Sequence, residues 1–455
     1  MALELRAQLH VFEVTPPTSE HARNVVNEMG REEPEPGYAA MDKQHPWVLS
    51  KVLPASALEK VPSTPPSKHD PDQDYLLGLR GCLAVMSFLW VFLQTFAPAA
   101  VAHSANDTGP ESHLGLRKSL SVLFWNDSLI YNSIIFLSAR MICLPFLLNL
   151  SKIQLASTVL RRGLRLWFPV CTALIVVWIA FSLNLGNQYL YEFADLTGNN
   201  SMAKDIYILP THLTHFNSIF DIFWVTHDFN SQAGNWAFPT QTLWIVSVLF
   251  QQSYTVYAAM VIIPYTRKSW RLVGAAFFII TAWWVYSWAW FSITGLLLAD
   301  LVVDMDLRAR CQRHRVFALG TAVVLLAAGF AMQFIWAAAR PDLYPSEIYY
   351  HTGLYTTGGV YTWNDTTAPQ LRADCYLAIV GFHVLLESSS ILRKIFANPV
   401  FKFLGNRSFS RCLHSNAKRM KLILIRLLPS AVDYRLHPWY QDRHQHDRGL
   451  NRRLF

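Results

Sequence analysis

Long blocks of apolar residues constrain this chain more than any other feature. Soluble cores are built from short apolar runs, whereas about 18 or more uncharged residues in a row are typical of a bilayer span. The composition agrees, because 52% of the 455 residues are hydrophobic and only 15% are charged. We therefore predict an all-α, polytopic membrane helical bundle. The apolar blocks lie near residues 79–101, 129–148, 166–185, 242–264, 272–305, 316–338 and 375–392.

The fifth block, residues 272–305, is too long for one span of about 20 residues. Lys and Arg beside a span favour the cytosolic side of the membrane. Positive clusters at residues 267–271 and 308–315 flank this block, and they can share the cytosolic side only if the block crosses twice. We predict a helical hairpin that turns near residues 286–292, with a re-entrant loop as the alternative. The whole chain then has about eight spans and both ends in the cytosol.

The two ends of the chain differ from its middle. Residues 1–72 are polar and rich in proline, and they bury too little apolar surface to offset the entropy of ordering. We expect a disordered cytosolic tail there. Residues 411–455 are basic and broken by proline, and we expect a tail that is truncated or aberrant. The transmembrane domain is expected to be residues 73–410.

Ionisable residues inside the predicted spans are the first candidates for function, because an isolated charge in hydrocarbon is costly. Arg140 lies mid-way along the second span, where it could contact a substrate or pair with Asp300. His383 and Glu387 lie four residues apart on one face of the last span. A carboxylate there can fix the imidazole tautomer and raise its basicity, which a general base needs. Alternatively, His383 only bonds a neighbouring helix and Glu387 reaches the membrane surface beside Arg393.

Six short motifs follow one another along the predicted spans. They are YLLGLRG at 75–81, FLSA at 136–139, RRGLRLWFP at 161–169, LWIVSVLF at 243–250, FSITGLLLADL at 291–301 and FLGNRSFS at 403–410. Together they resemble the acyltransferase-3 family, in its fungal branch. The resemblance implies a multi-span O-acyltransferase that moves an acyl group from a cytosolic donor, such as acyl-CoA, to a hydroxyl of a sugar, lipid or secondary metabolite.

The resemblance also implies roles for arginines near the cytosolic face. Arg80 would hold the phosphates or the carbonyl group of the donor, and Arg162 and Arg165 would line a pocket for its anionic groups. Arg140 is also predicted to contact the substrate, because of its position inside a span and not because of the resemblance. An arginine at the end of a span can instead anchor the helix at the headgroups, so both readings remain open.

The chain departs from the family pattern at three positions. The family would place aspartate, histidine and glutamate where this chain has Leu77, Val91 and Leu249. His383 with Glu387 is therefore the predicted replacement base. Two other functions stay open: a non-catalytic homologue that binds an acyl donor or a lipid, and a transporter whose buried charges line a polar path.

The remaining expectations concern partners and location. The expected partners are the acyl donor, its hydroxyl acceptor and the lipid bilayer, and not a nucleic acid. We expect no cofactor apart from acyl-CoA as a co-substrate, and no metal, since His212, His215 and His227 lack a convincing third ligand. The protein is expected in the endoplasmic reticulum, another endomembrane or the plasma membrane, with a cytosolic N-terminus.

Overall fold

A computed structural model describes residues 73–102, 109–149, 152–182, 211–225, 242–340 and 371–406, together with residues 192, 229, 234–235 and 369. Within these ranges every regular element is a helix, which confirms the all-α class. Both predicted tails, residues 1–72 and 411–455, lie outside the described residues, so the expectations for them stay predictions.

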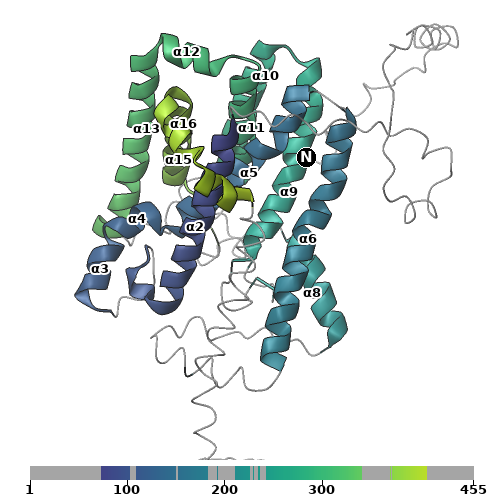
Figure 1. Cartoon of the computed structure of the whole chain (residues 1–455), viewed down its shortest axis with the longest axis vertical. Helices are drawn as coiled ribbons and strands as arrows, with labels where there is room; N and C mark the ends of the chain where they lie inside the picture. The colour runs from purple at the N-terminus through teal and green to yellow at the C-terminus, as the bar shows by residue number, and fades with distance from the viewer. Residues whose placement is uncertain are drawn as a thin grey trace, which may run out of the picture. The chain divides into compact units, whose positions relative to one another are not determined.

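The helices vary widely in length. They are α2 (Asp74–Phe96), η4 (Pro98–Ala100), α3 (Glu111–Arg117), α4 (Leu120–Phe124), α5 (Asp127–Asn149), α6 (Lys152–Ser182), α8 (His212–Trp224), α9 (Trp244–Ile262), η7 (Ile263–Tyr265), α10 (Lys268–Trp284), α11 (Ala289–Val303), α12 (Leu307–Arg313), α13 (Arg315–Phe334), η8 (Ile335–Ala339), α15 (Ala373–Ser388) and α16 (Ser390–Phe396). Figure 1 shows α12 at one end of this arrangement and α3, α4 and α8 at the other; we call these the α12 end and the α3 end.

Several of these helices are long and apolar enough to cross a membrane. Among the described residues there are five, or six if α15 and α16, which are bent by 103°, are one broken span. The five cover Asp74–Phe96, Leu120–Leu148, Leu155–Ile179, Trp244–Tyr265 and Arg315–Ala339. The chain therefore has the helices of a multi-pass membrane protein, although this count is lower than the eight spans predicted.

The long fifth block forms two helices that pack against each other, α10 and α11, as the charge pattern predicts. The turn between them contains Tyr286, whose φ of 58° is unusual for a residue with a side chain. The Ser287 N–H bonds the Ala282 carbonyl oxygen at 2.9 Å and closes this turn. With 17 and 15 residues, the helices are only about 26 and 22 Å long. They are too short to be counted among the spans above.

Ion pairs join α10 and α11 at the α12 end. Arg271 bonds Asp300 at 2.7 Å and also pairs with Asp304, which in turn lies 3.3 Å from Lys268. The hydrogen bond from Arg271, helped by Lys268, lowers the pKa of Asp304 despite its partial burial. A lowered pKa stabilises the folded state above the unfolded pKa of about 3.9, and this contribution is lost as the pH falls through the folded pKa.

We expect Asp304→Asn to lower the midpoint of thermal unfolding in detergent at pH 7. The effect should be small, because the Asp304 side chain is 42% exposed. The difference from the wild type should shrink as the pH is lowered from 7 to 3. Thermal unfolding of both proteins across this range is the measurement, and a difference that does not depend on pH would contradict the ion-pair explanation.

The centre of the fold is α5, which packs against α2, α9, α11 and α15. Figure 1 shows α5 among these helices. Small residues allow close packing around it, since a side chain on Gly295 of α11 would press against the Phe136 carbonyl oxygen of α5. Any polar side chain on the inner faces of α5 is therefore enclosed by other helices.

The first and last motifs of the sequence lie against each other. A Cβ on Gly78 of α2 would overlap the carbonyl oxygen of Phe396, at the end of α16. A Cβ on Gly405, in a helical stretch at residues 399–406, would overlap the carbonyl oxygen of Leu77. An ion pair of 2.8 Å between Asp74 and Lys402 joins the same two segments. The glycines in YLLGLRG and FLGNRSFS therefore serve close helix packing.

Candidate functional site

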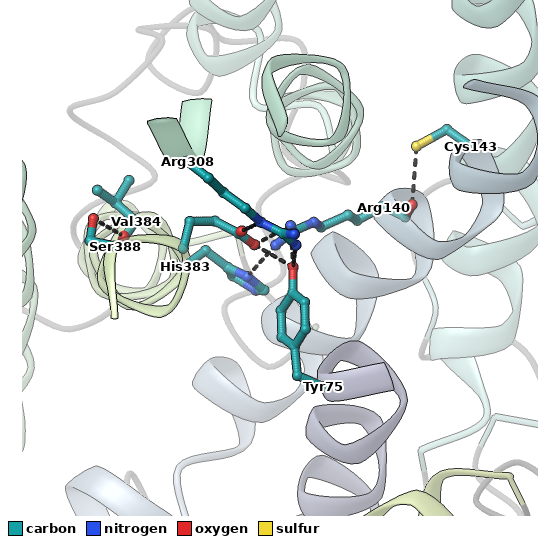
Figure 2. Close-up of polar contacts among 8 residues, drawn as sticks. Tyr75, Arg140, Cys143, Arg308, His383, Val384 and Ser388 are labelled. Carbon is teal, nitrogen blue, oxygen red and sulfur yellow. Dashed lines mark hydrogen bonds and ion pairs between the residues drawn. The ribbon is translucent and has the colours of Figure 1, made fainter. Parts of the chain in front are cut away.

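A cluster of polar side chains lies inside the protein, toward the α12 end. Figure 2 shows Tyr75, Arg140, Arg308 and His383 pointing toward one another. The members of the cluster are Tyr75 on α2, Arg140 on α5, Arg308 on α12, and His383 and Glu387 on α15. Four of them are at most 2% exposed, and two of these four, Arg140 and Glu387, are of types that are rarely buried so completely. We call this group the Arg140 cluster.

Glu387 is the hub of the Arg140 cluster. One carboxylate oxygen, Oε1, accepts hydrogen bonds from the Tyr75 hydroxyl at 2.5 Å and from Nη2 of Arg140. The other, Oε2, accepts from Nε of Arg308 at 2.9 Å. The Tyr75 hydroxyl also accepts from Nη2 of Arg140 at 2.9 Å. A buried carboxylate with this many donors is well compensated, so the cluster can hold charge without direct access to water.

Arg308 is the member of the cluster nearest to solvent, with a side chain that is 20% exposed. It lies on α12, which begins directly after Asp306, a residue with a left-handed φ of 49°. Burial alone would lower the pKa of Arg308, but the neighbouring Glu387 carboxylate and the Tyr75 hydroxyl outweigh it and raise the pKa. Arg308 therefore stays charged and links the short helix α12 to α15.

His383 contacts Arg140 and not the carboxylate of Glu387. Its Nδ1 lies 3.2 Å from Nη1 of Arg140, and its ring stacks on Phe136 with ring centres 4.5 Å apart. A guanidinium group can only donate, so Nδ1 must accept and the ring proton must lie on Nε2. The carboxylate that we expected to orient the imidazole bonds Arg140 instead. Arg140 thus stands between the two residues of the predicted base.

Two of the pairings considered from the sequence are wrong. Arg140 does not pair with Asp300, which bonds Arg271 at 2.7 Å. Glu387 does not reach the surface beside Arg393, because its side chain is fully buried and bonds residues of the Arg140 cluster. Arg140 and Asp300 project from α5 and α11 toward different neighbours, which the spacing in the sequence cannot reveal.

The other predicted site residues form a second group. Arg162 on α6 donates from Nε to the Ser253 hydroxyl at 3.0 Å and from Nη2 to the Ser138 hydroxyl at 2.9 Å. The charges of Arg80 and Arg165 act on Arg162, so both arginines lie within electrostatic range of it. Ser138 and Arg140 are two residues apart on α5, which places them about 200° apart around that helix. The two groups therefore flank α5.

Leu77, Val91 and Leu249 are the positions where the chain departs from the acyltransferase-3 pattern that it resembles, and two of them are core residues. Val91 and Leu249 are 6% and 8% exposed, and both belong to one hydrophobic cluster between the helices. Leu77 is only partly buried. No polar group takes the place of the family's histidine and glutamate at positions 91 and 249. If the chain has a catalytic base, it must come from elsewhere.

The sequence did not single out Tyr75 or Arg308 as site residues. Tyr75 opens the YLLGLRG motif, but a tyrosine at the end of a span usually marks the membrane interface. Arg308 belongs to a positive cluster that already had an explanation in the positive-inside rule. One feature of the sequence could have indicated Arg308 as a site residue. Arg308 and Glu387 were both predicted near the cytosolic face, where they could form an ion pair. Among the described residues, no group of three His, Cys, Asp or Glu side chains could hold a metal ion.

Comparisons with protein-family models, with curated proteins and with solved structures found no match. The function of this chain must therefore be inferred from its own residues.

Proposed function

We propose that this chain is a membrane-embedded O-acyltransferase similar to the acyltransferase-3 enzymes. It would move an acyl group from a cytosolic thioester, such as acyl-CoA, to a hydroxyl of a sugar, lipid or secondary metabolite. The observation that carries the proposal is that Arg162 bonds Ser138 of α5 and feels the charges of Arg80 and Arg165, while the buried Arg140 cluster lies across α5 from it. A site for an anionic donor then lies on one side of α5, and a buried site with hydrogen-bonding groups lies on the other.

The proposal includes a membrane topology. In it α10 and α11 each cross the membrane, which gives about eight spans, and the α12 end faces the cytosol. The arginines on and around α12 favour this orientation, because Arg308, Arg310 and Arg313 all lie on this short helix. The donor would then reach the arginines from the cytosol, and the membrane would be the endoplasmic reticulum, another endomembrane or the plasma membrane.

Donor binding is assigned to Arg80, Arg162 and Arg165. The charges of Arg80 and Arg165 repel that of Arg162, and an anion that binds near Arg162 would relieve this repulsion. Guanidinium groups also match phosphate geometry, since they donate two parallel hydrogen bonds. A thioester whose carrier bears phosphates therefore fits this group better than a neutral ester does.

The transfer itself exchanges one carbonyl bond for another. The acceptor oxygen attacks the thioester carbon, an ester C–O bond forms and the C–S bond breaks. The hydroxyl proton ends on the departing sulfur, which leaves as a free thiol. No oxidant or reductant is needed, so the donor and the acceptor are the only co-reactants.

The decisive experiment is release of free thiol by the purified full-length protein in detergent. Acyl-CoA is supplied with a panel of sugar, lipid and small-alcohol acceptors, and thiol release should depend on one of the acceptors. The fold is monitored in parallel by circular dichroism. A folded protein that releases no thiol with any acceptor overturns the enzymatic function.

We expect Arg162→Gln to weaken acyl-CoA binding by roughly 10- to 100-fold, the usual loss when a hydrogen bond to a charged group is removed. Arg161→Gln is the matched control, because Arg161 is the adjacent residue on α6 and is exposed. Equilibrium binding of acyl-CoA by both variants is the measurement. If both substitutions weaken acyl-CoA binding equally, the loss comes from the lower positive charge of the protein and not from a specific contact with Arg162. That result would contradict the assignment.

A second candidate is a homologue that binds an acyl donor or a lipid without catalysis. It is favoured by the apolar environment of Val91 and Leu249, and by the contact of Arg140 with the accepting nitrogen of His383. This candidate predicts that acyl-CoA binds, that Arg162→Gln weakens binding and that no acceptor produces thiol. The same two measurements therefore separate the candidates.

A further inference from the structure

The imidazole of His383 is held in one tautomer by Arg140. The guanidinium donates to Nδ1 at 3.2 Å, which leaves the ring proton on Nε2. Arg140 is itself fixed, because its Nη2 bonds both Glu387 and the Tyr75 hydroxyl. The orientation of the histidine ring therefore depends on three other side chains.

The ring cannot easily turn over to exchange its nitrogens. His383 is 2% exposed, one face of its ring stacks on Phe136 and Phe382 packs edge-on at 5.9 Å. Within the described residues, its one hydrogen bond is the contact with Arg140. The Nε2–H group is thus a donor, in a 98% buried residue, that has no acceptor among those residues.

A donor that is almost removed from water and has no protein acceptor is open to a ligand atom or to a water molecule. The complementary ligand atom is an oxygen acceptor. A neutral imidazole that donates from Nε2 suits a carbonyl oxygen that gains negative charge during acyl transfer, as in an oxyanion hole. The same imidazole is not suited to act as a general base. Its one free nitrogen lone pair, on Nδ1, already accepts the hydrogen bond from Arg140.

We propose that His383 is a fixed hydrogen-bond donor to the carbonyl oxygen of an acyl ligand, and that Arg140 is the positioning residue that sets its tautomer. This inference rests on the proposed function for the identity of the ligand, and it replaces the role of base with that of oxyanion donor. During transfer, Nε2–H would stabilise the oxygen of the tetrahedral intermediate, while the hydroxyl proton passes to the departing thiolate.

The first test is a binding comparison that needs no turnover. Two probes are used: a ketone analogue of acetyl-CoA, in which a methylene group replaces the thioester sulfur, and the corresponding alkyl analogue without the carbonyl. The wild-type protein should bind the ketone about tenfold more tightly, which corresponds to one hydrogen bond. His383→Gln should keep this preference, because the glutamine amide nitrogen reaches the position of Nε2.

His383→Asn and His383→Ala should lose the preference, since neither places a donor at that position. The asparagine amide reaches only the position of Nδ1, so this variant is the matched control for side-chain polarity. If the wild type binds both probes equally, or if His383→Ala still prefers the ketone, the inference about His383 is wrong. The proposed function is not affected by that result. If neither probe binds, the proposed function falls and the inference falls with it.

The second test measures the tautomer directly by ¹⁵N magnetic resonance of histidine-labelled protein, with His383→Gln used to assign the signal. The wild type should show a neutral imidazole protonated at Nε2. Arg140→Lys should keep this tautomer, because the ammonium group can still donate to Nδ1, whereas Arg140→Met should lose it. A proton on Nδ1 in the wild type overturns the inference whatever the probes show.

Discussion

Replacement of Glu387 by Gln is expected to lower the free energy of unfolding by about 3–5 kcal/mol, the usual effect of removing one partner of a buried ion pair. The carboxylate accepts hydrogen bonds from Arg140, Arg308 and Tyr75, and its side chain is fully buried. An uncharged amide leaves the Arg140 charge enclosed without a counter-charge. Equilibrium unfolding of the purified protein in detergent, titrated with dodecyl sulfate, is the measurement.

The control for this prediction is another carboxylate in an ion pair, Asp74, which bonds Lys402 at 2.8 Å. Its side chain is 24% exposed, so Asp74→Asn should cost at most about 1 kcal/mol. Replacement of Arg140, Arg308 and Glu387 together by apolar residues should restore much of the loss, because no buried charge then lacks a partner. A loss below about 1 kcal/mol for Glu387→Gln would mean that water reaches the cluster.

The distribution of charge along the sequence was sufficient to predict how residues 272–305 fold. Arginine and lysine on either side of this block predicted a chain that turns back on itself, and α10 and α11 do form a helical hairpin. This worked because the positive-inside rule depends on the identity of residues near a span and not on its packing. The number of complete crossings depends on helix length and tilt, which local charge does not determine.

Part of the candidate site could also be identified from the sequence. Arg140, His383 and Glu387 stood out because each interrupts an apolar block, and the structure brings all three together. Their pairing could not be predicted, because it depends on which faces of α5 and α15 meet. The separation of four residues between His383 and Glu387 suggested a direct contact. In the fold, Arg140 from another helix bonds both residues.

Replacement of Gly78 by Ala is expected to destabilise the protein by about 1–3 kcal/mol, the usual cost of adding a methyl group to a packed interface. The new Cβ would overlap the carbonyl oxygen of Phe396, and backbone atoms cannot rotate away as a side chain can. The end of α16 would therefore have to move away from α2. Since Tyr75 lies one turn before Gly78, the Arg140 cluster should loosen as well.

The matched control is Gly320→Ala on α13, another glycine inside an apolar helix. A Cβ at Gly320 meets no atom within 4 Å. The stability of this variant should therefore change only through the higher helix propensity of alanine. We expect it to be neutral or up to about 1 kcal/mol more stable than the wild type. Equilibrium unfolding of both variants under the same conditions gives the comparison. If Gly78→Ala behaves like Gly320→Ala, then α2 and α16 do not pack at this distance. The glycines of YLLGLRG would then need an explanation other than close helix contact.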